Sequence, residues 1–354
     1  MELVKISRRQ PARAAPARAL RCEYRSVAEM VMGHLLTGSR RIATAWEQTR
    51  HHEWQKSSSG RFEIRGKTLG ILGLGNIGKM VARLAEGFGV NILFYDSDEV
   101  ARTVGETMEW AVAESPEELF AKSDLVTIHL SAEDGRGRSN EGVVSLAQLM
   151  AMGAERPEDS PRVLVNLARG MIFRTEDLRA AVEAGAVRQA FVDVFPAEPQ
   201  AGRPEWTNPY ADLPSVFATP HIGAATRDAQ PRIASKMART ARLLSHQGTV
   251  EDCVYAPRRR IDVARSAEAP HILAVVHSDE RGTKKAVDDA LFHAGVNNLQ
   301  SAHRDFPRYG MAYDLSVLER ALSPDEIDSL VAEASRITGR EDAVRAVRQI
   351  ELSS

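Results

Sequence analysis

The chain of 354 residues holds only two cysteines, Cys22 and Cys253, which lie far apart and in no spacing typical of metal ligands. This scarcity argues against a disulfide scaffold and against a zinc site, and it fits a reducing compartment. We therefore predict no metal and a cytoplasmic location. No run of residues approaches the roughly 18 apolar positions that a membrane-spanning helix requires, so no membrane association is predicted.

An excess of one charge is also missing, because 46 lysines and arginines oppose 48 aspartates and glutamates. The formal net charge of −2 offers no electrostatic footprint for nucleic acid as a partner. Aromatic residues are sparse at 6%, but hydrophobic residues reach 43%, an ordinary globular composition. A chain of this length can bury the cores of two or three domains.

The first 24 residues differ from the rest of the chain. Up to Arg21 they carry six basic residues against the single acid Glu2, with two prolines and no apolar segment. A secretory signal is therefore not predicted. We expect a disordered leader over 1–24, with an organellar presequence or a misplaced start as the alternatives.

From residue 25 onward, short apolar runs alternate with helical patterns, and the first helical pattern covers 25–54. Strands are predicted at 69–72, 90–95, 124–130, 162–168 and 189–195, and helices at 76–88, from Pro116 onward, at 175–184 and at 223–246. Such alternation indicates a parallel sheet with right-handed crossovers, the doubly wound Rossmann-type α/β fold. We predict that this domain spans 25–248.

The remainder of the chain has a different order of predicted elements. Residues 249–270 are predicted to be a linker, in which the arginine run 258–260 is a solvated connector. In 271–354 the predicted order is strand, helix, strand, strand, helix and strand, at 271–276, 283–293, 298–303, 311–318, 323–337 and 344–352. This βαββαβ order is typical of a small ferredoxin-like α+β domain.

A glycine-rich turn, Gly73-Leu74-Gly75-Asn76-Ile77-Gly78, lies between an apolar strand and a helix. Its glycines suit a tight turn, close approach of a pyrophosphate and close helix packing, and the helix start at Asn76 and Ile77 supplies N–H groups. Asp96 ends the next strand about 20 residues on, as the dinucleotide fingerprint requires. Its carboxylate can accept from ribose hydroxyls and would repel a 2′-phosphate, so NAD is favoured over NADP.

Three further motifs carry reactive side chains: Asn166-Leu167-Ala168-Arg169-Gly170, Asp193-Val194-Phe195-Pro196-Ala197-Glu198-Pro199 and Thr219-Pro220-His221-Ile222-Gly223. The Arg169 guanidinium can hold a carboxylate bidentately and polarise the neighbouring keto oxygen. His221 can exchange a proton with the substrate oxygen, and Glu198 can orient that imidazole and stabilise its charged form. Downstream of a dinucleotide fingerprint, this set suits hydride transfer to a 2-keto acid.

With these motifs, residues 25–257 resemble the D-isomer-specific 2-hydroxyacid dehydrogenases. Arg-Ser-Val-Ala-Glu at 25–29 and the segment 62–67 add to the resemblance. It implies that Arg169, Glu198 and His221 form the catalytic triad. It also implies contacts with the NAD cofactor, mostly on its nicotinamide side, from Leu167, Ala168, Asp193, Gly223 and Ala224.

Residues 271–354 resemble the effector-binding ACT domains of some family members. Their His-x-Asn-x-Pro-Gly turn corresponds to 277–282, where Asp279 replaces asparagine and Arg281 replaces proline, and Gly295-Val296-Asn297 matches the second effector loop. The candidate effector residues are therefore His277, Asp279 and Asn297. Because an aspartate would repel a serine carboxylate, effector binding and mere subunit assembly both stay open. The resemblance also implies a homo-oligomer.

The family carries a substrate domain ahead of the 25–29 motif, and residues 1–24 do not resemble it. We expect most of that domain to be missing here. The ACT-like tail favours D-3-phosphoglycerate, oxidised to 3-phosphohydroxypyruvate in the first step of serine biosynthesis, as the reaction. The alternatives are another small D-2-hydroxy acid, such as glycerate or glycolate, and a truncated, weakly active NAD-binding chain.

Overall fold

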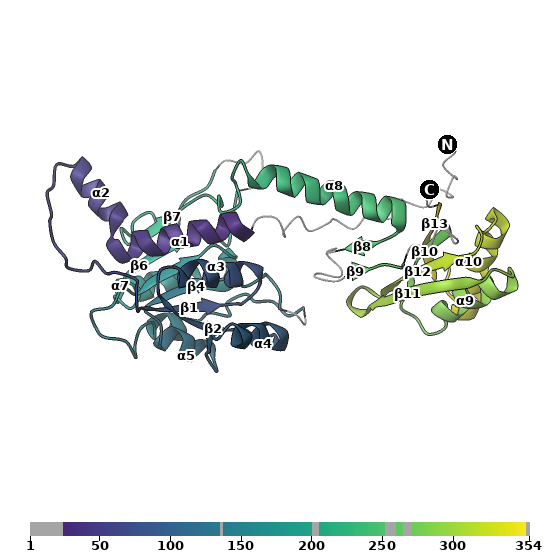
Figure 1. The fold of residues 1–354 in the computed structure, drawn as a ribbon, viewed down its shortest axis with the longest axis horizontal. Helices are drawn as coiled ribbons and strands as arrows, with labels where there is room; N and C mark the ends of the chain where they lie inside the picture. The colour runs from purple at the N-terminus through teal and green to yellow at the C-terminus, as the bar shows by residue number, and fades with distance from the viewer. Residues whose placement is uncertain (1–23, 135–136, 200–204, 252–259, 265–270, 352–354) are drawn as a thin grey trace. The chain divides into compact units, whose positions relative to one another are not determined.

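The structure, a computed structural model, describes residues 24–351 except 135–136, 200–204, 252–259 and 265–270. The predicted leader up to residue 23 and both cysteines lie outside the described residues. Two compact units divide after Pro231, one preceding and one following that residue (Figure 1). The division falls earlier than the predicted domain end at 248, inside a helix.

A seven-stranded parallel sheet is the centre of the first unit, in the order β3-β2-β1-β4-β5-β6-β7. The strands are β1 Thr68–Leu72, β2 Asn91–Tyr95, β3 Ala111–Val112, β4 Leu125–Ile128, β5 Val163–Asn166, β6 Gln189–Val192 and β7 Val216–Ala218. The central strands β4, β5 and β6 are buried at every position, as parallel strands covered on both faces are. The predicted Rossmann-type fold is confirmed.

Helices cover both faces of this sheet (Figure 1). They are α1 Tyr24–Arg40, α2 Ile42–Arg50, α3 Asn76–Glu86, α4 Glu99–Thr107, α5 Pro116–Ala121, α6 Leu146–Met150 and α7 Thr175–Glu183, with the 3₁₀ turn η1 Gly170–Ile172. One apolar cluster joins the sheet to α1 and α3, and a second joins it to α5, α6 and α7. The single helix predicted over 25–54 is wrong, because Arg41 adopts a left-handed φ of 51° that separates α1 from α2.

The second unit contains most of α8 (Ala229–Gln247) and a four-stranded antiparallel sheet in the order β11-β12-β10-β13. Its other elements are β8 Val250–Glu251, β9 Arg260–Ile261, β10 His271–Ser278, α9 Thr283–His293, β11 Asn298–Phe306, η2 Pro307–Tyr309, β12 Met311–Leu318, α10 Pro324–Thr338 and β13 Val344–Glu351. From β10 to β13 this is the predicted βαββαβ order. The described part of the predicted linker holds the short antiparallel pair of β8 and β9.

The start of α10 shows how local sequence sets an element boundary. Ser323 Oγ accepts from the Glu326 backbone N–H, and the Glu326 carboxylate accepts from the Ser323 N–H at 2.7 Å. Pro324 occupies the first helical position, where its missing N–H costs no hydrogen bond. Within the part of the chain that the structure describes, no helix has both the length and the apolarity to cross a membrane.

Candidate active site

The predicted site residues follow the carboxyl ends of neighbouring strands in the first unit. The glycine turn follows β1 and Asp96 follows β2, while Arg169, Asp193 and His221 follow β5, β6 and β7 in turn. Because parallel strands all end at the same edge of a sheet, these segments line one edge. Open α/β sheets bind their ligands at this edge.

The glycine turn has the close packing that its sequence predicts. A Cβ on Gly78 would lie 2.2 Å from the Gly73 carbonyl oxygen, and Gly73 itself has a left-handed φ of 96°. Gly75 is the N-cap of α3, and a glycine cap has no side chain to occupy the first-turn N–H groups at Asn76 and Ile77. The positive end of α3 can therefore receive a pyrophosphate.

Asp96 connects the end of β2 to the glycine turn. Its Oδ2 accepts from the Leu74 N–H at 2.7 Å, and its Oδ1 accepts from the Asp98 N–H at 2.9 Å. Each carboxylate oxygen can accept more than one hydrogen bond, so these contacts leave capacity for ribose hydroxyls. The residues present fit a dinucleotide at this position.

A buried amide fixes the turn that carries Arg169. Asn166 Oδ1 accepts from the Ala168 N–H at 3.0 Å, and its Nδ2 donates to the Arg169 carbonyl at 3.1 Å. The Arg169 guanidinium donates to the Ala168 carbonyl at 2.6 Å. Leu167 and Ala168 are buried in the two apolar clusters, so a cofactor contact from either would use its backbone.

His221 and Glu198, which the motifs predict to be catalytic, form a hydrogen-bonded pair. His221 Nδ1 lies 2.7 Å from Glu198 Oε2, and the other carboxylate oxygen accepts from the Phe195 N–H at 3.1 Å. Half of the His221 side chain is exposed. With Nδ1 engaged by the carboxylate, Nε2 is the nitrogen that can exchange a proton with a substrate. His221 has a left-handed φ of 54°, which is uncommon for a non-glycine residue.

Residues 32–223 match the family described as D-isomer specific 2-hydroxyacid dehydrogenase, NAD binding domain. This stretch covers more than half of the chain. The chain belongs to this dehydrogenase family. The matched domain is the NAD-binding one, so the predicted family and the predicted cofactor are both confirmed.

Relatives of this chain include the D-3-phosphoglycerate dehydrogenase of Haemophilus influenzae, 30% identical over 286 residues, 81% of this chain and 66% of that protein. A phosphoglycerate oxidoreductase structure from Vibrio cholerae is 27% identical, with a TM-score of 0.51, and covers 64% of this chain and 67% of that one. A glyoxylate reductase structure from Paecilomyes thermophila is 25% identical, with a TM-score of 0.55, and covers 66% of both chains. The chain spans 64% to 66% of the length of the first curated relatives.

Asp193 positions the loop that carries His221. The carboxylate is 1% exposed; its Oδ1 accepts from Thr219 Oγ1 at 2.6 Å and the Ile222 N–H at 2.9 Å, and its Oδ2 accepts from the Gly223 N–H at 2.7 Å. These bonds hold 219–223 as a loop. The helix predicted from Gly223 therefore begins later, at Ala229. Contacts of Asp193, Gly223 and Ala224 with the cofactor stay predictions.

Asp193→Asn is expected to destabilise the first unit by about 2 kcal/mol, because one buried backbone N–H then faces an amide NH₂ that cannot accept. The same change disorders the His221 loop, so kcat/KM should also fall. Urea unfolding and steady-state kinetics measure the two effects. The exposed acid Asp228, near the same loop, supplies the matched control: Asp228→Asn should change neither quantity, and equal behaviour of both variants would contradict this role for Asp193.

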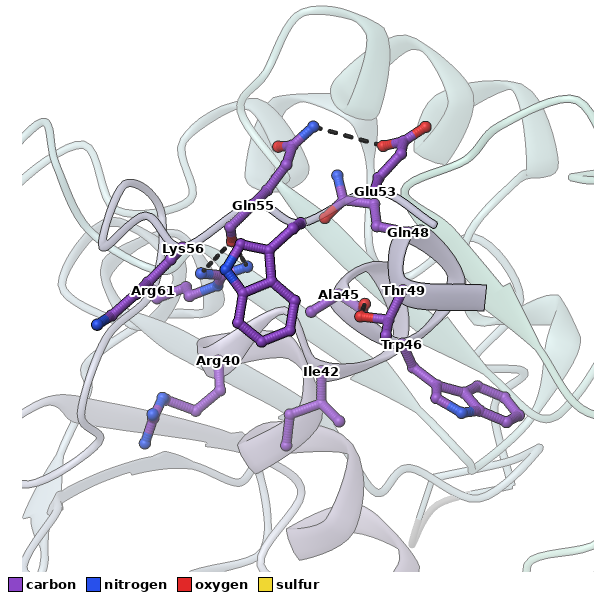
Figure 2. A pocket seen from close by; sticks show the side chains of 11 residues that line it. Arg40, Ile42, Ala45, Trp46, Gln48, Thr49, Glu53, Gln55, Lys56 and Arg61 are labelled. Atoms are coloured by element: carbon purple, nitrogen blue, oxygen red, sulfur yellow. Dashed lines mark hydrogen bonds between the residues drawn. The ribbon is translucent and has the colours of Figure 1, made fainter. Parts of the chain in front are cut away.

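The surface of the described part of the first unit has hollows, among them a larger and a smaller one. One of about 620 Å³ lies beside α2, and its lining in Figure 2 contains none of the predicted site residues. The other, about 410 Å³, includes Glu198 and the residues around it. Its lining includes neither Arg169 nor His221, so the candidate site rests on the strand ends and the His221–Glu198 contact rather than on a hollow.

The candidate effector residues are not brought together within one chain. His277 lies near the end of β10 that pairs with Met311, whereas Asn297 precedes β11, whose first residue pairs with Leu318 at the other end of β12. His277 is buried, and Asp279 and Asn297 are exposed. An effector that touches all three would have to bridge copies of the chain, so their role stays a prediction.

The sequence did not predict that Thr219 and the Phe195 N–H support the His221–Glu198 pair. A backbone N–H leaves no signal in the sequence, and a threonine before proline is common in turns. The burial of His129 was also not predicted. This residue follows β4 beside the glycine turn, with Nε2 2.9 Å from Thr127 Oγ1 and a buried Nδ1 that has no hydrogen-bond partner among the described residues.

Burial lowers the pKa of His129 to about 3, from an ordinary value of 6.5. As the pH falls, His129 is therefore protonated in the unfolded chain before it is protonated in the folded one. The free energy of unfolding decreases as the pH falls from 6.5 toward 3. At pH 5 the loss is expected to be about 2 kcal/mol. Urea unfolding at pH 7 and pH 5 tests this: His129→Gln should lose less stability between the two pH values than the unchanged chain does. An equal loss in both proteins would contradict it.

Proposed function

We propose that this chain is an NAD-dependent dehydrogenase that interconverts a D-2-hydroxy acid and the corresponding 2-keto acid. The observation that carries the proposal is the 2.7 Å pairing of His221 Nδ1 with Glu198 at the edge of an NAD-binding sheet. NAD, when bound at the glycine turn, supplies the acceptor for the hydride of the oxidation step. The residues of the chain supply binding, orientation and proton exchange.

During oxidation, His221 Nε2 takes the hydroxyl proton of the substrate as the C–H bond breaks, and in reduction it returns that proton to the oxygen. Glu198 holds the imidazole in one orientation through Nδ1 and stabilises its positive charge. Arg169 binds the substrate carboxylate, since a guanidinium matches two carboxylate oxygens. Asp193 keeps His221 in place through the loop 219–223.

For the substrate, we propose D-3-phosphoglycerate, oxidised to 3-phosphohydroxypyruvate in serine biosynthesis. Curated relatives named for this reaction, at 30% identity, support the choice. The ferredoxin-like second unit, which resembles an ACT domain, agrees with it. We propose that this unit assembles the chain into a cytoplasmic homo-oligomer. A small unphosphorylated 2-keto acid is the second candidate, favoured by the similarity to a glyoxylate reductase.

The test is oxidation of NADH by the purified chain with 3-phosphohydroxypyruvate, hydroxypyruvate or glyoxylate as acceptor. We expect turnover with all three, the highest kcat/KM with the phosphorylated acid, and a lower kcat/KM with NADPH. Equal kcat/KM for hydroxypyruvate and its phosphate ester would overturn the proposed substrate but not the proposed reaction class. Absence of turnover with every acid, while NADH fluorescence shows binding, would overturn the dehydrogenase proposal.

A further inference from the structure

Three side chains that can bind a metal ion converge on one face of the antiparallel sheet in the second unit. His303 on β11 pairs in register with Asp314 on the neighbouring strand β12. His277 on β10 pairs with Ala312, two residues from Asp314, and since side chains alternate along a strand, His277 and Asp314 share that face. One donor atom of each of the three residues lies within 4.8 Å of the others.

Both histidines direct a lone pair toward this cluster. His277 Nδ1 lies 2.8 Å from the Ser278 carbonyl, which only accepts, so Nδ1 carries the hydrogen and Nε2 has the lone pair. That Nε2 is buried and has no hydrogen-bond partner among the residues that the structure describes. His303 Nε2 donates to Asp305 at 2.7 Å, which leaves the lone pair on Nδ1. The two rings are stacked, with centroids 5.4 Å apart.

Asp314 adds a buried carboxylate to the two imidazoles. Its side chain is 1% exposed; Oδ2 lies 3.0 Å from Lys284 Nζ, and Oδ1 has no hydrogen-bond partner within the described ranges. The cluster therefore holds two imidazole lone pairs and a buried carboxylate, with the Lys284 ammonium beside one carboxylate oxygen. Buried acceptors are almost always satisfied in folded proteins, so His277 Nε2 and Asp314 Oδ1 indicate room for a further positive group beside the Lys284 ammonium.

We propose that His277, His303 and Asp314 bind one divalent transition-metal ion of the zinc type. Imidazole nitrogens suit zinc, nickel, cobalt and copper, whereas magnesium and calcium prefer oxygen ligands throughout. Donors around a tetrahedral zinc ion lie about 3.3 Å apart, so the cluster has to contract on binding. His303 can provide that movement, because its side chain is 28% exposed on the edge strand β11.

The surroundings of the two histidines agree with metal binding. Each imidazole donates from its other nitrogen to an oxygen, the Ser278 carbonyl or the Asp305 carboxylate, and such partners fix metal-binding histidines in the required orientation. Three protein ligands leave a coordination position for water or for another molecule. Analysis of cysteine spacing predicts no metal, but the residues here come from three separate strands.

Lys284 competes with the ion for Asp314. Its ammonium also donates to Asp288, one turn further along α9, so it can keep that partner when an ion takes the Asp314 carboxylate. Removal of the lysine charge should therefore strengthen metal binding. A misfolded variant would lose affinity for the ion rather than gain it. An increase in affinity in the variant without this lysine therefore distinguishes the proposed site from a damaged fold.

The experiment is zinc titration of the chelator-treated full chain in competition with a chromophoric zinc indicator. We expect one ion per chain, affinity lowered at least about 100-fold by His303→Gln, and affinity raised about tenfold by Lys284→Gln. His293→Gln, at an exposed histidine of the same unit, is the matched control and should leave the affinity unchanged. Circular dichroism checks the fold of each variant.

Cobalt supplies a second measurement, because the visible absorption of bound Co²⁺ reports its coordination by imidazole and carboxylate. We expect this spectrum for the unchanged chain and its loss in His303→Gln. Zinc uptake that is equal in the unchanged chain and in His303→Gln would overturn the site, as would an affinity that Lys284→Gln lowers. Neither readout depends on dehydrogenase turnover, so failure here leaves the proposed function untouched.

Discussion

His221→Asn is expected to lower kcat about 1,000-fold, because asparagine cannot exchange a proton at the position where the His221 imidazole does. The substitution suits the backbone, since asparagine tolerates the left-handed φ of 54° that His221 adopts. The amide can still reach toward Glu198, so the loop should keep its shape. The loss then measures the chemistry rather than the fold, and NADH affinity should stay unchanged.

A second histidine provides the matched control for this variant. His52 is exposed, follows α2 and has a left-handed φ of 62°, so His52→Asn makes the same replacement in the same backbone conformation. In steady-state kinetics of NADH oxidation, the kcat of His221→Asn should be about 1,000-fold lower than that of His52→Asn, which should equal the kcat of the unchanged chain. A kcat for His221→Asn within tenfold of the unchanged chain would show that His221 is not the proton-exchanging group.

Gly170→Ala is expected to destabilise the first unit by about 3 kcal/mol, the upper range for forcing atoms into a packed site. An added Cβ would lie 2.0 Å from the Phe195 carbonyl carbon and 2.3 Å from its oxygen. These are backbone atoms, which cannot rotate away as a flexible side chain can. The contact joins the segment that carries Arg169 to the segment that carries Glu198, so the variant should also lose activity.

Gly33→Ala tests whether the effect belongs to the contact rather than to the loss of a glycine. Gly33 lies in α1 with nothing within 4 Å of an added Cβ, and alanine favours a helix over glycine by about 1 kcal/mol. Thermal unfolding of the full chain should therefore show a lower Tm for Gly170→Ala and an equal or higher Tm for Gly33→Ala. Equal Tm values for Gly170→Ala and the unchanged chain would mean that the two segments can separate at little cost.

Helices and strands that are marked by a few neighbouring residues were predicted well from the sequence. Apolar runs located the central strands, the glycine turn located α3, and the capping residues Ser323 and Glu326 located α10. These signals are local because backbone hydrogen bonding and helix capping involve residues close in sequence. Elements without such signals were not predicted. The break at Arg41 depends on one left-handed residue, and the three-residue strand β7 forms through its pairing with β6.

The sequence by itself determined the family and predicted the reaction class, because Arg169, Glu198 and His221 follow an intact dinucleotide fingerprint in a recognisable order. Only the tertiary structure decided how these groups are arranged: it brings His221 to 2.7 Å from Glu198 and turns the Asp193 carboxylate toward the His221 loop. The tertiary structure also brings together His277, His303 and Asp314, which no local motif indicates. The physical reason is strand pairing, which sets side chains from distant parts of the chain next to one another in a register that local sequence does not specify.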